Sequence, residues 1–520
     1  LDKLIHQFAD PLSFYREVIQ NALDAGSQEV EIYLTFEEGT EGDSGVTIIH
    51  IDDWGAGMTR EIIERRLTRL FSSSKDGDRT KIGKFGIGFV SVFATEPELV
   101  CIDTSREGEH WRVLFTADKK FELRRLEQPV DGTKIRIYKR TTRDEHDDLV
   151  RRSRDVIRYW CKHTHGDVRF EDEPIVEPFD LDAPIKIRHE EDASIYVVAH
   201  PADESSFFGF YNRGLTLLEG EGEHYEGIHF KVSSDLLEHT LTRDNVLEDE
   251  NYHKAMKLLE KVIREDLSAA FQKQVMGLLK DYPETAPELG HLMASAGAVL
   301  SRWRDYFPSS FAELALFPVL HGPPQSIQQA RAAAKAEECV YVDSRPTEVS
   351  KRLHEEGIPV FWTSLETSLA SGLEAVCGRP ARSASRSVAT PIVVESPPAL
   401  RKIGWNVVAM LRRGKASVMK VQLADFDYEG STISDLPCLV QRHLGDPVRL
   451  FERGFWSRLQ MYPGALLYNR RHPLVRKALA QAEHSPLLAA FVLAKAALLQ
   501  DGLPDKVEAK IAERAMSIKS

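Results

Sequence analysis

The fold of this chain is decided by the stretch Glu17-Val18-Ile19-Gln20-Asn21-Ala22-Leu23-Asp24-Ala25-Gly26. The apolar spacing before and within it predicts a helix from Pro11 to Gly26. Glu17, Asn21 and Asp24 are four and three residues apart, so they project from one side of that helix. An amide oxygen can coordinate Mg²⁺, and a neighbouring carboxylate can orient or deprotonate a water. A solvated polar helix face has the same spacing, so this stretch alone leaves both interpretations open.

A second motif follows the predicted strands Val30–Phe36 and Val46–Ile51, in the order Ile51-Asp52-Asp53-Trp54-Gly55-Ala56-Gly57-Met58. An Asp that enters a turn with two glycines can accept a hydrogen bond from an exocyclic amine. The glycines let a flat ring approach the backbone. An ordinary Asp-Gly turn is equally compatible with this motif alone.

A third motif is the glycine-rich run Gly83-Lys84-Phe85-Gly86-Ile87-Gly88-Phe89 at the start of a predicted helix, Phe85–Phe93. Exposed N–H groups and the positive end of a helix dipole favour phosphate there. The run lacks the Gly-Lys-Ser/Thr of a Walker A loop and the strand–turn–helix setting of a dinucleotide fingerprint. By itself it is weak evidence.

Taken in order, the three motifs resemble the Bergerat nucleotide-binding fold of the GHKL ATPases. Asp131-Gly132-Thr133-Lys134-Ile135 resembles the late Gly-Thr strand of that superfamily. The resemblance implies ATP and Mg²⁺ as cofactors, with Glu17 activating the attacking water, Asn21 ligating Mg²⁺ and Asp53 binding the adenine amine. The remaining nucleotide-binding residues that it implies are Asp24, Gly55, Gly57, Met58, Lys75, Gly83, Lys84, Phe85, Gly86, Ile87, Gly88, Phe89 and Thr133.

The rest of the chain resembles the 90-kDa heat-shock chaperones, in a divergent, bacterial (HtpG-type) form. Leu241-Thr242-Arg243-Asp244-Asn245, before a predicted helix Tyr252–Met276, is similar to the loop whose Arg reaches the γ-phosphate. Arg243 would therefore be catalytic, and a surface ion pair with Asp244 or Glu248 is the alternative. Residues 339–362 and 465–475 resemble later parts of the same family. One departure is the short segment between Lys75 and Gly83, where the family carries a longer lid.

The predicted fold class is α/β, an α+β sandwich in the leading domain. We expect a Bergerat ATP-binding domain at 1–145, an α/β middle domain at 146–380, a linker at 381–398 and a helix-rich dimerisation domain at 399–520. The linker prediction comes from the Arg, Ser, Ala and Pro between Gly378 and Pro398.

The composition of the chain limits the classes of protein to which it could belong. The chain has 520 residues, a formal charge of −13 and no apolar run long enough to span a membrane. Its five cysteines form no C-x-x-C pair, which favours a reducing, cytoplasmic location. The acidic balance makes nucleic acid an unlikely partner.

The resulting hypothesis is an ATP-hydrolysing, chaperone-like homodimer that opens and closes on unidentified client proteins. Apolar residues after Pro473 would join the two protomers, with an intramolecular helical hairpin as the alternative. One rival is a GHKL protein that acts on nucleic acid, related to MutL or the chromatin-associated ATPases, and another is a protein that binds ATP only as a structural switch.

Overall fold

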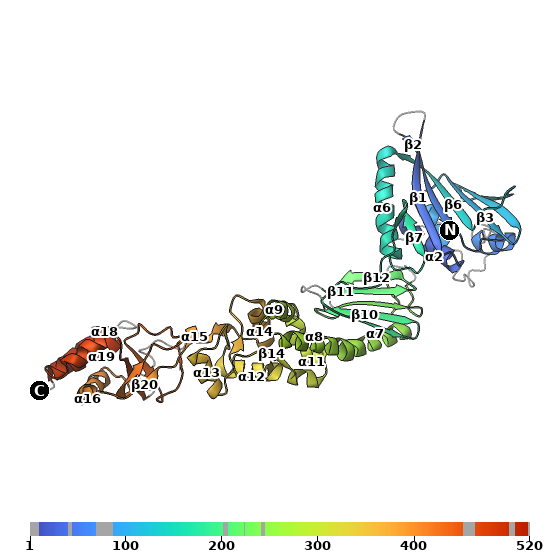
Figure 1. The fold of residues 1–520 in the computed structure, drawn as a ribbon. Coiled ribbons are helices and arrows are strands. Elements are labelled where there is room, and N and C mark those ends of the chain that lie inside the picture. Colours follow the sequence, from blue (N-terminus) through green and yellow to red (C-terminus); the bar gives the residue numbers. More distant parts are fainter. Residues whose placement is uncertain are drawn as a thin grey trace. The chain divides into compact units, whose positions relative to one another are not determined.

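The computed structural model describes residues 10–39, 44–68, 87–200, 206–222, 224–240, 245–450, 463–498 and 505–517. The chain divides into two compact units, residues 1–267 and 268–520 (Figure 1). Both combine helices with strands, which confirms the predicted α/β class. This division is coarser than the predicted one, whose boundaries stay predictions.

The first unit begins with an eight-stranded sheet in the order β5-β4-β3-β6-β2-β1-β7-β8. Its neighbouring strands are antiparallel except for β1 and β7, which run parallel. The bounds are β1 Glu29–Glu38, β2 Ser44–Asp53, β3 Leu99–Arg106, β4 Glu109–Thr116, β5 Phe121–Arg125, β6 Thr133–Thr142, β7 Asp167–Phe170 and β8 Glu173–Pro174. The sheet thus continues past residue 145, the boundary expected from sequence, because β7 pairs with β1.

Strand alternation and register place one row of apolar side chains across this sheet. Ile51 lies opposite Ile32 on one side and Ile135 on the other, and Ile135 lies opposite Ile102. All four are buried. Asp53 is two residues beyond Ile51, so its side chain leaves the sheet on the same face.

Helices cover that face. They are α2 (Phe14–Asp24) and α6 (Arg143–Cys161), with the short α3 (Arg60–Ile62), η2 (Ile63–Leu67), α5 (Ile87–Val90) and η4 (Ser91–Thr95) nearby. Phe14 and Ile19 of α2 and Ile157 of α6 join the apolar row in one core. The predicted stop at Gly26 is confirmed by its positive φ of 83°.

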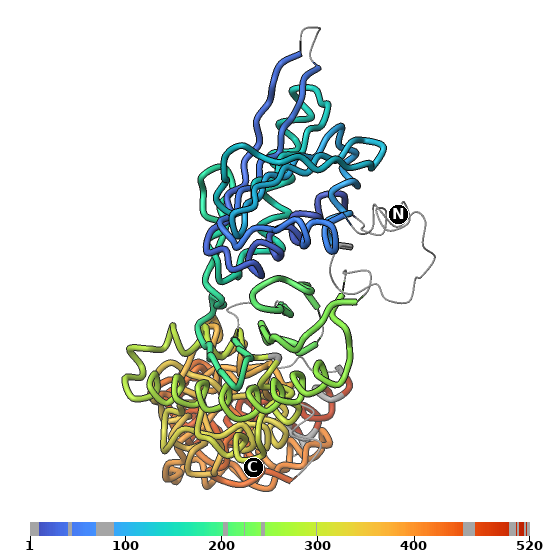
Figure 2. The backbone as a smooth tube through the Cα atoms, turned by 90° about the vertical axis from the view of Figure 1, so that its right-hand side faces the viewer, coloured from blue at the N-terminus to red at the C-terminus, as the bar shows by residue number. Residues whose placement is uncertain are grey.

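A second sheet completes the first unit, in the order β12-β11-β13-β10-β9. Figure 2 follows the chain from the first sheet, in blue and teal, to this second sheet, in green. Its strands are β9 Ile185–Glu191, β10 Ser194–His200, β11 Phe207–Asn212, β12 Leu215–Glu221 and β13 His229–Ser234, followed by α7 Glu250–Val262 and η5 Ile263–Leu267.

The second unit starts with helices and a small parallel sheet, β17-β16-β18. Strand β16, helix α13 and strand β17 form a strand–helix–strand unit, with β16 and β17 parallel. The bounds are α8 Ser268–Lys280, α9 Ala286–Ser295, α10 Gly297–Ser301, α11 Trp303–Tyr306, η6 Ser309–Glu313, β14 Ala315–Phe317, β15 Gln325–Ser326, α12 Ile327–Glu337, β16 Val340–Asp343, α13 Glu348–Glu355, β17 Phe361–Trp362, α14 Ser368–Cys377 and β18 Ala381–Ser383.

The predicted linker at 381–398 needs correction, because much of it is packed secondary structure. It contains β18, α15 (Ala384–Ser387), β19 (Val388–Ala389) and β20 (Ile392–Val394). Ala384, Val388 and Ala389 are buried in hydrophobic clusters. Small residues fill tight core positions as readily as they form linkers, so composition could not separate the two.

The last part of the chain packs helices against the sheet β20-β21-β24-β22. Its further elements are α16 Pro398–Arg413, β21 Val418–Asp425, β22 Cys438–Gln441, β23 Val448–Arg449, β24 Gly464–Asn469, α18 Pro473–Gln481, α19 Pro486–Leu498 and α20 Asp505–Ser517. Val475 and Leu493, which we expected at a dimer interface, are fully buried in this protomer's own core, while Leu488 is exposed. The intramolecular packing is therefore present, and dimerisation stays a prediction.

Among the helices of the described residues, none has the length and apolar character that crossing a membrane requires.

Candidate functional site

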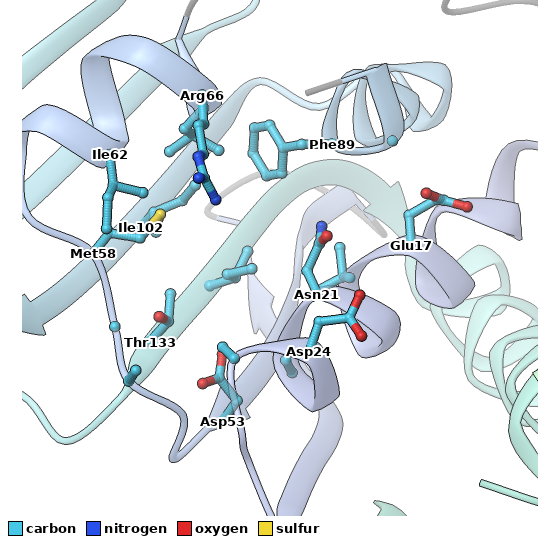
Figure 3. A pocket seen from close by; sticks show the side chains of 18 of the residues that line it. Glu17, Asn21, Asp24, Asp53, Met58, Ile62, Arg66, Phe89, Ile102 and Thr133 are labelled. Carbon is cyan, nitrogen blue, oxygen red and sulfur yellow. The ribbon is translucent and has the colours of Figure 1, made fainter. Parts of the chain in front are cut away.

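A cavity of about 470 Å³ lies between α2 and the first sheet, beside the end of β2, the end of β3 and the start of β6 (Figure 3). Its wall is supplied by α2, the end of β2 with the turn that follows it, α3 with η2, α5, and strands β3 and β6. The predicted site residues that line it are Glu17, Asn21, Asp24, Asp53, Gly57, Met58, Gly88, Phe89 and Thr133. The structure therefore brings residues from all three sequence motifs, and from the Gly-Thr strand, around one space.

Helix α2 contributes the polar wall. Its opposite face is anchored in the core, so Glu17, Asn21 and Asp24 line the cavity from successive turns. Glu17 is buried, whereas Asn21 and Asp24 are exposed. Gly88 comes close to the Glu17 carboxylate, because a Cβ on Gly88 would lie 2.3 Å from Oε2. A side chain at that position would therefore force the Glu17 carboxylate to move.

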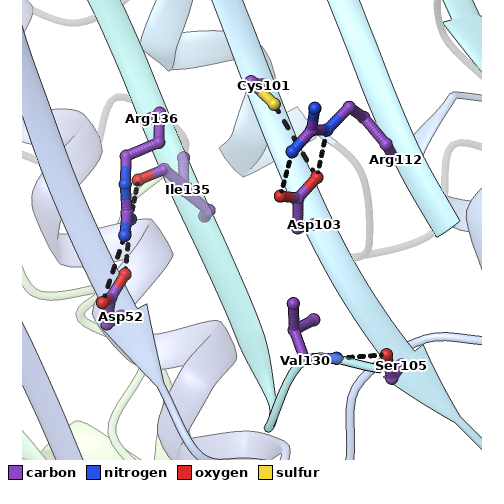
Figure 4. A network of polar contacts seen from close by, with 8 residues as sticks. All are labelled: Asp52, Cys101, Asp103, Ser105, Arg112, Val130, Ile135 and Arg136. Atoms are coloured by element: carbon purple, nitrogen blue, oxygen red, sulfur yellow. Dashed lines mark hydrogen bonds and ion pairs between the residues drawn. The ribbon is translucent and has the colours of Figure 1, made fainter. Parts of the chain in front are cut away.

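The two neighbouring aspartates have opposite surroundings. Asp52 projects from the other face of the sheet and forms an ion pair with Arg136 (Figure 4). It also pairs with Lys134, at 3.4 Å. Figure 4 also shows Asp103 and Arg112, which form a bidentate ion pair in which both N–O distances are 2.6 Å. Asp53 instead faces the cavity, is 7% exposed and accepts a hydrogen bond from the Gly55 N–H at 2.9 Å.

Burial raises the pKa of the Asp53 carboxyl above its ordinary value, although the Gly55 N–H acts in the opposite direction. A carboxylate in such a place is poorly hydrated, so it gains much from a donor that enters the cavity. An exocyclic amine of an adenine is a donor of the required kind.

The turn after β2 needs glycine for steric reasons. Gly57 has a φ of 63°, and a Cβ there would lie 2.1 Å from the Ser105 carbonyl oxygen. The Met58 N–H next to it donates to Thr104 Oγ1 at 2.9 Å, and Thr104 Oγ1 lies 3.2 Å from Thr133 Oγ1. This chain of hydrogen bonds ties the turn to β3 and β6, so the floor of the cavity is preorganised.

Sequence analysis missed several residues of the wall. Arg66, on η2, projects into the cavity in Figure 3, and Arg106 lines it from the end of β3. The apolar part of the wall also includes Ile62, Ile102 and Ile135. A usable signal existed for Arg66, because it follows Ile62 by four residues and such positions share a helix face.

The other predicted residues either lie outside the described residues or do not line the cavity. Lys75, Gly83, Lys84, Phe85, Gly86 and the segment between Lys75 and Gly83 lie outside the described residues, and so does Arg243. Ile87 is the first residue of α5. Gly55 lies in the turn after β2, and a Cβ added to it would lie 3.1 Å from Asp53 Oδ1.

The donor set of the cavity fits a magnesium–nucleotide better than a metal held by protein alone. Within the part of the chain that the structure describes, no group of three or more His, Cys, Asp or Glu residues is placed to hold a metal ion. Mg²⁺ is commonly bound by one or two protein oxygens together with phosphates and water. The Asn21 amide, with Glu17 one turn away, supplies such a partial set.

Comparison with known proteins agrees with this geometry. A family described as "Histidine kinase-, DNA gyrase B-, and HSP90-like ATPase" matches residues 15–146. The leading domain is a GHKL-type ATPase domain. The match ends in α6 and covers the motifs around Asn21, Asp53, Gly88 and Thr133.

Curated relatives narrow the likeness to one branch of this superfamily. The chain is 30% identical over 191 residues to "Chaperone protein HtpG" of Methylococcus capsulatus, covering 31% of this chain and 30% of the relative. It is 29% identical over 199 residues to the HtpG protein of Magnetococcus marinus, covering 33% and 31%. The corresponding values for Chlorobium phaeobacteroides are 32% over 163 residues, with 26% of each chain covered.

The chain thus spans about a third of the length of the curated relatives that it matches. The resemblance predicted from the motifs is confirmed: this is a divergent, HtpG-like GHKL ATPase in its leading domain. The relatives carry the name of a chaperone, and that function is transferred to this chain only as a proposal.

Proposed function

We propose that this protein binds Mg²⁺–ATP in the cavity beside α2, hydrolyses it, and uses the cycle to act as a chaperone-like machine. The observation that carries the proposal is the pairing of a buried, cavity-facing Asp53 with the acid and amide of α2 across one space. One end of the cavity can recognise a base, and the other can hold phosphates.

Adenine would lie at the Asp53 end. Asp53 would accept the exocyclic amine, and Met58, Ile102 and Ile135 would supply apolar surface for the ring. Thr133 belongs to the hydrogen-bonded chain beneath this end, so it would support the ring position. The backbone at Gly57 lines this end of the cavity.

Phosphates would extend along α2 toward Glu17. When bound there, Mg²⁺ would neutralise phosphate charge. Asn21 would hold the ion through its amide oxygen, and Glu17 would orient the attacking water and accept its proton. Arg66 adds a positive charge to the wall on the side opposite α2, and Gly88 keeps the space beside Glu17 open.

The chaperone part of the proposal is supported by the HtpG relatives and by the sequence around Arg243. Arg243 would contact the γ-phosphate, so ATP and ADP would favour different arrangements of a homodimer acting on client proteins. The proposed location is the cytoplasm. Both the dimer and the clients require direct tests.

Calorimetry on the full chain with Mg²⁺–ATP and Mg²⁺–ADP tests the binding proposal. Phosphate release in the wild type and in Glu17→Ala tests hydrolysis, with binding expected to survive in the variant. No binding of either nucleotide by the folded wild type would overturn the proposed function. A variant that binds but turns over at the wild-type rate would remove Glu17 from the mechanism.

The biological role needs two further measurements. Turnover should respond to an unfolded protein and stay unchanged with double-stranded DNA, and the reverse outcome would favour the nucleic-acid-acting alternative. Small-angle scattering with ADP and with a non-hydrolysable ATP analogue should show a dimer that becomes more compact with the analogue. A monomer in both states would refute the homodimer.

A further inference from the structure

Helix α16, drawn in orange in Figure 1, lies in a strongly basic part of an otherwise acidic chain. The chain carries a formal charge of −13, yet the 29 residues from 396 to 424 contain six Lys and Arg and no Asp or Glu. All six cations are exposed: Arg401, Lys402, Arg412, Arg413, Lys415 and Lys420. The segment is therefore a local positive surface, which the net charge of the whole chain does not reveal.

One face of α16 is fixed in the hydrophobic core. Its buried side chains follow helical spacing and belong to one cluster with residues of β21 and α19: they include Leu400, Ile403, Val407, Met410 and Leu411. A Cβ on Gly404 would lie 2.8 Å from Val421 Cγ2, so the helix lies directly against β21. The packing of this face determines which side chains of α16 point outward.

The outward face of α16 presents a tryptophan between cations. Trp405 is 73% exposed, so a large apolar ring is left in water. Arg401 precedes it by four residues and Arg412 follows it by seven, which places both on one side of the ring. Lys402 and Arg413, eleven residues apart, border the other side of the ring by the same helical spacing. Trp405 thus lies on the outward face with two cations on each side.

The fold does little to neutralise these cations. Within the part of the chain that the structure describes, Lys402 and Arg413 form no ion pair, and Arg401 forms one with Glu395 in which both side chains are largely exposed. Arg412 donates to a backbone carbonyl of β21 at 2.9 Å, which orients the side chain without neutralising its charge. The helix dipole favours cations in the last turn, so it explains Arg412 and Arg413 but not Lys402, near the positive end of the helix.

We propose that the outward face of α16 is a docking surface for an acidic segment of another protein. Carboxylates of that segment would pair with the four cations, and one of its apolar side chains would cover the Trp405 ring. Trp and Arg are among the residues that contribute most to binding at protein interfaces. Complementary charge would guide the acidic segment to this face, although the chain as a whole is acidic.

The make-up of this face favours a protein segment over two other anionic partners. A helix that lies in a membrane surface buries a broad apolar face, but the apolar face of α16 is already in the core. Single-stranded nucleic acid is held by several aromatic side chains along a positive groove, whereas the outward face of α16 carries one aromatic ring. A short acidic segment needs the charges and one apolar anchor, and this face supplies both.

A synthetic peptide tests the proposal on the full chain. The 16 residues of α16 extend about 24 Å, a length that an extended peptide of about eight residues spans. The probe is a fluorescein-labelled peptide of that length, made of Glu with one central Phe, and its binding is followed by fluorescence anisotropy without nucleotide. Binding should weaken as salt is added, and the same peptide with Lys in place of Glu should not bind. Because no nucleotide is present, the result does not depend on the proposed ATPase function.

Two variants of the face and one matched control separate its contribution from that of overall charge. Trp405→Ala should raise the Kd for the Glu peptide about ten- to thirtyfold, the scale of a central interface residue. Lys402→Glu combined with Arg413→Glu should raise it at least about tenfold. The control, Lys257→Glu with Lys273→Glu, reverses two exposed lysines on α7 and α8 and changes the net charge equally. It should leave the Kd within about twofold of the wild type.

Several outcomes would overturn the proposal. One is a folded wild type that does not bind the Glu peptide, and another is equal weakening in the control. Binding to phosphatidylserine vesicles or to an oligo-dT strand, but not to the peptide, would assign the face to lipid or to nucleic acid. A particle mass that Trp405→Ala halves would make a second copy of the chain the occupant. Thermal melting checks that each variant folds, and the double charge reversal remains a test if Trp405→Ala does not.

Discussion

Replacing Asp53 with Asn is the sharpest perturbation of the site. Asn is nearly isosteric, and its amide oxygen can still accept the 2.9 Å hydrogen bond from the Gly55 N–H. In that orientation its NH₂ group takes the place of the second carboxylate oxygen. A donor then faces the exocyclic amine of adenine, which is also a donor, so one hydrogen bond is lost and a buried donor is left unsatisfied.

The magnitude follows from these two losses. A hydrogen bond to a charged group contributes roughly 1.5–3 kcal/mol, and a buried unsatisfied group costs roughly 1–3 kcal/mol. Together they predict a loss of about 2.5–6 kcal/mol in binding, which is roughly two to four orders of magnitude in Kd. In calorimetry such a variant would show no measurable binding at ordinary protein concentrations.

The protein without nucleotide should respond in the opposite direction. Because burial raises the pKa of Asp53, the folded state disfavours the ionised form at neutral pH. Asn removes that unfavourable charge, so the apo variant should melt no lower than the wild type. For the same reason, the affinity of the wild type for nucleotide should fall as the pH is lowered and Asp53 becomes protonated. This fall should begin at a higher pH than it would for an exposed Asp.

The assay is therefore a pair of measurements on each protein: thermal melting without ligand, and ADP titration by calorimetry. Asp52→Asn is the matched control, since Asp52 pairs with Arg136 on the other face of the sheet. Wild-type ADP affinity in folded Asp53→Asn would refute the adenine assignment. Equal loss of affinity in Asp52→Asn would show that the effect came from the strand and not from the cavity.

Three further predictions use other parts of the wall. Glu17→Ala should bind ATP but hydrolyse it about 10²- to 10⁴-fold more slowly, the range of a lost general base, as measured by single-turnover phosphate release. Gly57→Ala should destabilise the fold by about 1–3 kcal/mol in chemical denaturation, because its Cβ would meet the Ser105 carbonyl and its φ is 63°. Arg66→Gln should weaken ATP and ADP about 5- to 30-fold and leave adenosine unchanged, so equal weakening of adenosine would place Arg66 at the base instead.

Sequence predicted the parts of this fold that are set by short-range patterns. Helix α2 was predicted because its apolar stripe and its glycine stop lie within sixteen residues of each other. The first strands were predicted because their alternation is regular. Alternation explains why Asp53, which the motif singles out, faces the cavity and Asp52 does not, since only one of two adjacent strand residues can share the face of Ile51.

Other features depend on contacts between distant residues. Strand β7 joins β1 across more than a hundred residues, and its four residues carry no signal that names this partner. Arg66 looks like a solvated helix residue until β3 and α5 enclose the space in front of it. The packed segment at Ala384–Ala389 was missed because small residues look alike in linkers and in tight cores.

The distribution of burial along α2 suggests how the site could distinguish ATP from ADP. Glu17, at the first turn, is buried, and Asn21 and Asp24, toward the other end, are exposed. Seven residues of helix separate Glu17 from Asp24, a rise of about 10 Å. A nucleotide anchored by its base at Asp53 would place successive phosphates along that length, with the metal at the exposed middle beside Asn21. Only its last phosphate would reach the dry end near Glu17 and Gly88, so the two nucleotides would differ most where hydration is lowest and a charge matters most.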